Sequence, residues 1–271
     1  MSAALTVQVS HEGRTSKLFD VACTLGPRDK PYPERHGHWT IALVRRGTFN
    51  YRAADTNKVH TLHAGWLLLG RPEREYECSH DETCGDDCVS LEVSHDVIAD
   101  VASATKGCSA ATVNVPVMAP VARASALFER TRLRRDEDID EIGYLVAEAV
   151  VAEAARAPRG EVAPHPSHRG RIDDAIRAIE ASCDQPLSLA ELAARAGLSP
   201  FHFLRVFRRV TGTTPHQYLI GARLRRAARL LLDTSRPVTE IAYDAGFEDL
   251  SNFVRTFHRT IGCTPRAYRR R

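Results

Sequence analysis

The strongest constraint on this chain is a sequence that is repeated within its last third. The first copy, residues 187–218, reads LSLAELAARAGLSPFHFLRVFRRVTGTTPHQY, and the second, residues 238–268, reads VTEIAYDAGFEDLSNFVRTFHRTIGCTPRAY. Hydrophobic, glycine, arginine and tyrosine positions of the first copy recur 49 or 50 residues later in one register. Matches of this density are hard to obtain by chance, and they indicate two copies of one structural unit.

Each copy reads as a short helix, a glycine turn and a second helix, which is the helix-turn-helix layout. In the first copy, Gly197 marks a left-handed turn and Ser199 is the expected N-cap of the second helix. Phe203 and Phe207 share the stripe of that helix that is expected to face the core. We expect helix-turn-helix motifs at residues 189–210 and 238–261.

The opposite face of each second helix is basic and polar. It carries Phe201, His202, Leu204, Arg205 and Arg208 in the first copy and Ser251, Asn252, Val254, Arg255 and His258 in the second. Arginine can bind guanine or phosphate, asparagine can bind adenine, and an apolar side chain can contact a thymine methyl group. The alternative is that these arginines form a solvent-exposed face of an ordinary helical bundle. Two copies with the same pattern in one register favour DNA binding instead.

The segment between the copies, TPHQYLIGARLRRAARLLLD, is predicted to form one helix from Thr214 to about Asp233. Twenty helical residues span roughly 30 Å. Successive major-groove faces of DNA lie roughly 34 Å apart. One rigid helix could therefore hold two reading helices on the same side of a duplex.

Residues from about 170 to 270 resemble the DNA-binding domain of the AraC/XylS-type bacterial transcription regulators. The resemblance rests on a lead-in helix over Ile172–Cys183 and on the segments TGTTPHQYL, ARLRRAARLLLDT and PVTEIAYDAGFEDLSNFVRTFHRTIGCTPRAYRR. It covers over a third of the chain. It implies a regulator that reads an asymmetric site in double-stranded promoter DNA, with RNA polymerase as a further partner.

The resemblance also assigns reading positions, which are Ser199, Phe201, His202, Leu204, Arg205 and Arg208 in the first motif and Ser251, Asn252, Val254, Arg255 and His258 in the second. Leu204 occupies a position that is often polar in the family. Charge agrees with a nucleic-acid partner, because residues 169–271 hold 18 arginines against 10 acidic residues, a balance of +8. The remaining residues hold 19 basic against 24 acidic side chains, a balance of −5. Such regional charge predicts salt-dependent DNA binding.

The chain length and the positions of proline- and glycine-rich segments predict a multidomain α+β protein. A proline- and glycine-rich stretch predicts a linker at 159–169 between a domain at 1–158 and a domain at 170–271. The family resemblance implies that the first is a sensor and dimerisation domain and the second a DNA-binding domain. The N-terminus has no signal-peptide pattern, and no apolar run approaches the length needed to cross a membrane. Seven cysteines, an odd number, favour reduced thiols in the cytoplasm.

Residues 5 to about 115 read as short strands, which suggests a β-sandwich or small barrel. Strands at Trp39–Val44 and Thr48–Arg52 flank RRG, a predicted hairpin turn. Two helices are expected at Val121–Arg134 and Ile139–Ala157. The family resemblance implies a cupin-like sensor domain in which such helices pair two subunits into a homodimer; alternatively, they pack on the barrel.

A cysteine cluster is the sharpest feature of this half: Cys78, His80, Cys84 and Cys88 lie within eleven residues. Thiolates and an imidazole can bind Zn²⁺ or another soft transition metal. The spacing is not a standard zinc pattern, so Cys23, Cys108 or a histidine from HGH or HTLH would complete the site. Redox or electrophile sensing and an inert loop remain alternatives, although the neighbouring carboxylates raise thiol pKa values and disfavour reactivity.

His36 and His38 form an H-x-H that is half of a catalytic cupin site, but Arg74 and Glu75 stand where the second half should supply a histidine. We therefore expect no enzyme activity and a regulator that responds to a small effector or a metal ion. The alternatives are a metal-dependent cupin enzyme and a DNA-repair methyl acceptor fused to an AraC-type domain. Activation and repression of transcription are both open.

Overall fold

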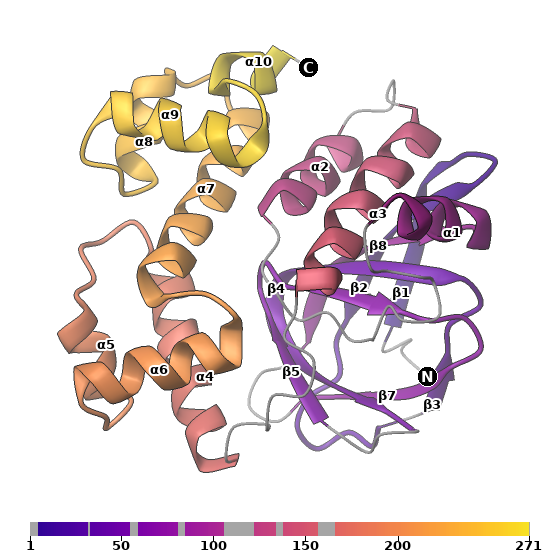
Figure 1. The fold of residues 1–271 in the computed structure, drawn as a ribbon, viewed down its shortest axis with the longest axis horizontal. Coiled ribbons are helices and arrows are strands. Elements are labelled where there is room, and N and C mark those ends of the chain that lie inside the picture. The colour runs from indigo at the N-terminus through magenta and orange to yellow at the C-terminus, as the bar shows by residue number, and fades with distance from the viewer. Residues whose placement is uncertain are drawn as a thin grey trace. The chain divides into compact units, whose positions relative to one another are not determined.

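The computed structural model describes residues 5–31, 33–54, 59–80, 85–105, 122–133, 138–156 and 166–270. The chain forms two compact units, Met1–Ala157 and Pro158–Arg271, here called the N-terminal unit and the C-terminal unit (Figure 1). Residues 159–165 of the predicted linker, together with Cys84 and Cys108, lie outside the described residues. No helix within the described ranges has an apolar stretch long enough to cross a bilayer.

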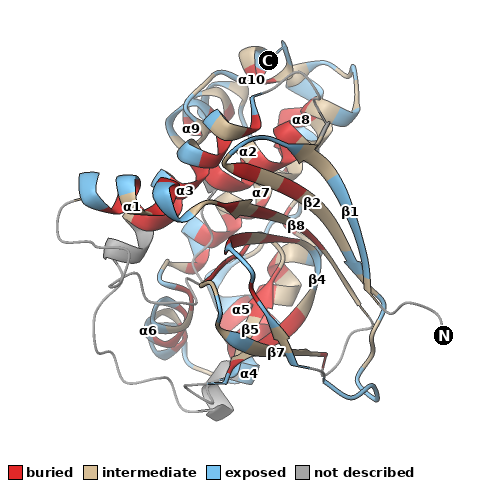
Figure 2. Cartoon of the chain, turned by 90° about the vertical axis from the view of Figure 1, so that its right-hand side faces the viewer, coloured by how far each residue is buried: buried red, intermediate tan, exposed pale blue. Residues whose placement is uncertain are grey.

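The N-terminal unit is built on one antiparallel sheet. Its strands are β1 (Leu5–Glu12), β2 (Ser16–Cys23), β3 (Pro33–Arg35), β4 (Trp39–Ala53), β5 (Val59–His63), β6 (Leu67–Gly70), β7 (Glu75–Ser79) and β8 (Asp86–Val93). The strand order is β1-β2-β8-β4-β7-β3, and β5 and β6 also pair with β4. Figure 2 shows that much of β1, at one edge, is exposed to solvent.

Strand β4 corrects a prediction, because the expected hairpin turn at RRG is wrong. The chain continues through Arg45 and Arg46 as one strand of 15 residues. A register shift between Val44 and Arg46 and a left-handed Gly47 (φ 76°) bend the strand instead of reversing it. Its first half pairs with β8 and β6 and its second half with β5 and β7.

Three helices accompany the sheet in the described part of this unit, not the two predicted: α1 (His95–Ala104), α2 (Ala122–Leu133) and α3 (Ile139–Arg156). Helix α1 falls where strands were expected. Ser94 caps it by accepting a hydrogen bond from the Val97 N–H group (3.4 Å). Ile98, on the same buried stripe as Val97, packs in one core with Val146 of α3 and Leu91 of β8. The helical spacing of buried residues after a serine cap was the signal that could have identified α1.

The C-terminal unit is helical. It contains α4 (Pro166–Ala181), α5 (Leu189–Arg195), α6 (Pro200–Thr211), α7 (Pro215–Asp233), α8 (Val238–Asp244), α9 (Leu250–Ile261) and α10 (Pro265–Arg270). Helix α4 begins inside the stretch expected to be linker. In Figure 1, α7 runs from the group α4–α6 at one end to the group α8–α10 at the other.

The two copies of the repeat build matching cores. In the first, Phe207 lies 5.5 Å from Phe203 and 5.7 Å from Tyr218, measured between ring centroids. In the second, Phe257 lies 5.5 Å from both Phe253 and Tyr268. Edge-on aromatic contacts of this kind contribute about 0.5–1.5 kcal/mol each beyond their buried area. The same three aromatic positions therefore hold each second helix onto the helix that follows it.

Candidate functional site

Local sequence positions α6 and α9 in the same way. Ser199 caps α6 by accepting from the His202 N–H group (3.4 Å), and Asp249 caps α9 by accepting from the Asn252 N–H group (3.0 Å). The preceding turns pass through glycines with left-handed backbones, Gly197 (φ 61°) and Gly246 (φ 89°). Each pair, α5–α6 and α8–α9, is therefore a short helix, a glycine turn and a capped second helix.

Exposure along α6 and α9 is the same at ten of their twelve matched positions. Residues 201–210 and 251–260 have identical sequences of exposed, half-buried and buried side chains. Of the predicted reading residues, Ser199, Phe201, His202, Arg205, Arg208, Ser251, Asn252, Arg255 and His258 are exposed, and Leu204 and Val254 are half-buried. The exposed residues define the outer faces of α6 and α9.

Two arginines were missed among these residues. Arg209 and Arg259 are exposed at matching positions of α6 and α9 and extend each outer face by one basic side chain. Their matching positions in the repeat were the available signal. Both lie in the last turn of their helix, close to the Gly212 and Gly262 caps.

Side-chain contacts distinguish the residues on these faces. The Arg205 guanidinium carbon lies 6.0 Å from the ring centroid of Phe201, so the two residues form one exposed pair. On α9, Asn252 Oδ1 accepts a hydrogen bond from Thr256 Oγ1 (3.3 Å). The Ser199 hydroxyl is already an acceptor for the helix cap, which leaves its hydrogen as the atom available for a further partner.

Several arginines of this unit make hydrogen bonds or ion pairs within the unit. Arg223 donates to the carbonyl oxygens of Cys183 (2.7 Å) and Gln185 (3.1 Å), and Arg226 donates to that of Asp244 (3.0 Å). Arg225 pairs with Glu180. These contacts tie α7 to its neighbours. The regional charge of +8 therefore overstates the positive charge that is free to meet phosphate.

The N-terminal unit contains a cavity of about 240 Å³ between the strands. Its wall is largely apolar, with Val21, Phe49 and Leu68 among its members. Glu34, His36, Tyr76, Cys78, Asp86 and Cys88 line its polar parts. The cavity can hold a small molecule that presents both an apolar body and a polar group.

One polar part of the cavity is an aromatic stack. The His36 ring lies 4.2 Å from that of Tyr76, whose hydroxyl donates to Glu34, and Tyr76 lies 5.1 Å from Tyr51. Burial lowers the pKa of His36 to about 4, so its imidazole is neutral at physiological pH. His38 is exposed and pairs instead with Glu92 (3.5 Å). The two histidines of the H-x-H motif do not converge on one point.

The predicted cysteine cluster is only partly assembled within the described residues. His80 Nε2 lies 2.8 Å from Asp86 Oδ1, and Cys23, His80 and Asp86 place donor atoms within 4.8 Å of one another. Cys78 lies on β7 and Cys88 on β8, two strands that both pair with β4, and Cys84 is outside the described residues. Among the described residues, the group of close donor atoms thus combines the predicted His80 with Cys23, which was expected to complete the site, and with Asp86 at the start of β8.

The thiols of Cys78 and Cys88 are poor candidates for reactive groups. Burial raises the pKa of both well above the ordinary value, and Asp86 raises them further. The Cys88 thiol donates to Asp86 Oδ2 at 3.0 Å, which also stabilises its protonated form. Redox or electrophile chemistry needs a thiolate. The geometry therefore disfavours that alternative at these two positions.

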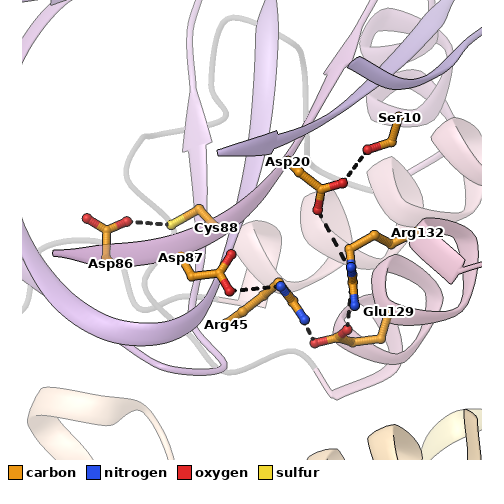
Figure 3. A network of polar contacts seen from close by, with 8 residues as sticks. All are labelled: Ser10, Asp20, Arg45, Asp86, Asp87, Cys88, Glu129 and Arg132. Carbon is orange, nitrogen blue, oxygen red and sulfur yellow. Dashed lines mark hydrogen bonds and ion pairs between the residues drawn. The ribbon is translucent and has the colours of Figure 1, made fainter. Parts of the chain in front are cut away.

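A polar network connects strand β8 to helix α2 (Figure 3). Arg45 of β4 pairs with Asp87 of β8 (2.9 Å) and with Glu129 of α2 (3.1 Å). Arg132 of α2 lies 3.7 Å from Glu129 and 4.0 Å from Asp20 of β2. Asp86 and Asp87 are adjacent on a strand and face opposite sides of the sheet. One carboxylate therefore faces the cavity and the next faces this network.

Known proteins resemble the C-terminal part of this chain. A family model described as "Helix-turn-helix domain" matches residues 192–271. Right origin-binding protein of Escherichia coli K12 is 40% identical over 101 residues, which are 37% of this chain and 35% of that protein. Regulatory protein SoxS of the same strain is 39% identical over 105 residues, 39% of this chain and 98% of SoxS.

A solved structure from Chromobacterium violaceum, described as a transcriptional regulator with an AraC-type DNA-binding domain, is 30% identical. The match covers 39% of this chain and 95% of that one, with a TM-score of 0.37. This chain spans about a third of the length of right origin-binding protein and nearly all of SoxS.

Proposed function

This chain belongs to the AraC/XylS-type family of bacterial transcription regulators, and we propose that it binds DNA sequence-specifically through two helix-turn-helix motifs, α5–α6 and α8–α9. The observation that carries the proposal is the identical exposure of α6 and α9 at ten matched positions. An ordinary bundle needs matching buried positions only. The outer faces also match, and both present an arginine at the same position, Arg205 and Arg255. This match supports DNA binding by both helices.

The outer faces offer the chemistry that base reading requires. Arg205 and Arg255 can each donate two hydrogen bonds to guanine, and Asn252 can pair with adenine. Phe201 presents an apolar ring to a thymine methyl group. Arg209 and Arg259, close to the helix ends, are placed to meet phosphates. Base contacts then select the sequence, and phosphate contacts hold the register.

Helix α7 supports simultaneous use of both motifs. Its 19 residues correspond to roughly 28 Å of helix, close to the roughly 34 Å repeat of the DNA major groove. The arginine contacts to Cys183, Gln185 and Asp244 hold α7 against both flanking groups of helices. A preorganised pair of motifs loses less conformational entropy on binding than two loosely linked ones.

We further propose that the N-terminal unit is a cupin-like sensor that uses its cavity for an effector. The signal would shift populations between DNA-binding and non-binding arrangements. The network from Asp87 through Arg45 to Glu129 offers a physical link between strand β8 and helix α2. Promoter DNA, RNA polymerase and a second copy of this chain are the proposed partners, with the cytoplasm as the proposed location.

The enzyme alternatives fit the geometry less well. A methyl-accepting cysteine attacks as a thiolate, whereas burial raises the pKa values of Cys78 and Cys88 well above the ordinary value. A cupin enzyme would use His36 and His38 together, and these side chains occupy different surroundings. A regulator is therefore the function best supported.

Selection of bound duplexes from a random DNA pool, followed by footprinting with the full-length protein, tests this proposal. We expect one enriched asymmetric motif with two protected major-groove segments about one helical turn apart. The double variant Arg205→Ala/Arg255→Ala should lose the enrichment. A pool without any enriched motif for the wild-type protein would overturn the proposal.

A further inference from the structure

Strand register brings two potential metal donors together. Strands β2 and β8 are antiparallel, and Cys23 is directly opposite Asp86. Residues opposite each other on neighbouring strands project from the same face of the sheet. Gly85, directly before Asp86, donates its N–H group to the Leu25 carbonyl oxygen (2.7 Å), two residues beyond the end of β2. Any Cβ at Gly85 would lie 2.3 Å from the Cys23 carbonyl oxygen.

His80 supplies a third donor from the other side of the same loop. It follows β7 directly, and its Nε2 lies 2.8 Å from Asp86 Oδ1. The side chains of His80 and Asp86 are only 1% and 8% exposed. His80 Nδ1 is buried and has no hydrogen-bond partner among the residues that the structure describes. A buried imidazole nitrogen without a partner is costly unless another group meets it.

We propose that Cys23, His80 and Asp86 bind a thiophilic divalent cation, for which Zn²⁺ is the probe. A thiolate, an imidazole and a carboxylate are the ligand types that Zn²⁺ takes in proteins. The donor atoms lie within 4.8 Å of one another, and a tetrahedral site would bring them to roughly 3.5 Å. Binding would displace the Cys23 proton, and the Cys23 sulfur would form the new bond to the metal.

This ligand set differs from the one predicted by sequence spacing. Cys78 and Cys88 remain neighbours of the site, and the Cys88 thiol already donates to Asp86 Oδ2. Asp86 also precedes Asp87, which pairs with Arg45. An ion at Asp86 would therefore act at the end of β8 that carries the network to α2. The regulatory meaning of the site rests on the proposed function, whereas the binding itself does not.

Competition with a chromophoric chelator, using full-length protein stripped of metal under reducing conditions, tests the site without DNA. We expect Cys23→Ser and Asp86→Asn each to weaken Zn²⁺ binding by more than about 100-fold, since removing even a residue behind a ligand costs about 10–100-fold. Cys263→Ser, a thiol change in the C-terminal unit, should bind like the wild type. Co²⁺ should show a thiolate charge-transfer band that Cys23→Ser abolishes.

Thermal unfolding of the metal-free variants verifies that each is folded. Wild-type affinity in folded Cys23→Ser, or a Co²⁺ spectrum that keeps its thiolate band in that variant, would overturn the proposal. DNA selection by the metal-free protein is scored separately. A failed metal site with intact DNA selection, or the reverse, therefore identifies which of the two proposals is wrong.

Discussion

The guanidinium group of Arg205 lies over the ring of Phe201, with its central carbon 6.0 Å from the ring centroid, while Phe201 is 71% exposed. An aromatic side chain this open to solvent serves no packing purpose in the C-terminal unit. Its ring contacts the arginine on the outer face of α6. The pair is therefore arranged for a partner that takes both an apolar and a cationic contact.

Arg205→Ala and Arg255→Ala should each weaken binding to the selected DNA site by about 1–3 kcal/mol, because each removes a proposed base contact. Phe201→Ala should weaken binding less. Fluorescence anisotropy at fixed salt measures the effect. Lys17→Ala, which removes a charge from the N-terminal unit, is the control and should leave the affinity unchanged. Wild-type affinity in both arginine variants would contradict the assignment of the outer faces.

Gly246→Ala should destabilise the C-terminal unit more than Gly197→Ala. Both glycines have left-handed backbones, which cost a residue with a Cβ roughly 1–2 kcal/mol. Only at Gly246 would the new Cβ meet crowded atoms, 2.8 Å from the Cys183 carbonyl oxygen and 2.9 Å from Arg223 Nε. At Gly197 the nearest atom, Arg171 Nη1, is 3.8 Å away.

The close approach of the new Cβ in Gly246→Ala should add about 1–3 kcal/mol to the destabilisation of that variant. Chemical denaturation monitored by circular dichroism compares the two glycine variants. Equal destabilisation would show that backbone conformation alone decides the cost and that the contact with Cys183 and Arg223 relaxes.

Arg45→Met should destabilise the N-terminal unit by about 3 kcal/mol, because it removes the nearer of the two cations beside the buried Glu129 carboxylate and leaves only Arg132, 3.7 Å away. The Arg45 and Glu129 side chains are only 11% and 10% exposed. Arg35→Met is the matched control, since Arg35 pairs with Glu75 at the surface, where such pairs contribute about 0–1 kcal/mol. In thermal unfolding, Arg45→Met should lower the melting temperature more than Arg35→Met does. Equal melting temperatures of the two variants would argue against a structural role for the network.

Asp140 should give the N-terminal unit a pH-dependent stability. Its carboxylate accepts from the N–H groups of Arg14, Thr15 and Ser16 at 2.9 Å each, which anchors α3 to the β1–β2 turn. Burial raises the pKa of Asp140, but these hydrogen bonds outweigh it and hold the pKa below its ordinary value. The stabilisation is therefore complete above the unfolded pKa of about 3.9 and is lost as the pH falls through the lower folded value.

Asp140→Asn should be less stable than the wild type at neutral pH, and the difference should shrink only below about pH 4. Denaturation midpoints of the two proteins across the acid range measure it. A difference that does not change with pH would assign the effect to packing rather than to the charge of Asp140.

Sequence patterns predicted the C-terminal unit far better than the N-terminal one. The capped helices α6 and α9 depend on contacts between residues three or four positions apart. This spacing is visible in the sequence as a helical period of apolar residues. The β4 bulge could not be distinguished from a hairpin, because an arginine pair followed by glycine is compatible with both. Helix α1 does have a helical pattern, a serine cap followed by apolar residues at helical spacing. It was assigned to the strands because it directly follows a series of predicted strands.

The sequence by itself determined most of the side chains on the outer faces of α6 and α9, because helical period assigns faces locally. Tertiary structure alone decided that Arg223, Arg225 and Arg226 make contacts within the C-terminal unit. It also decided that donor atoms of Cys23, His80 and Asp86 lie within 4.8 Å of one another. Cys23 and Asp86 meet only because β2 and β8 pair in one register, and strand register is set by the packing of the whole sheet.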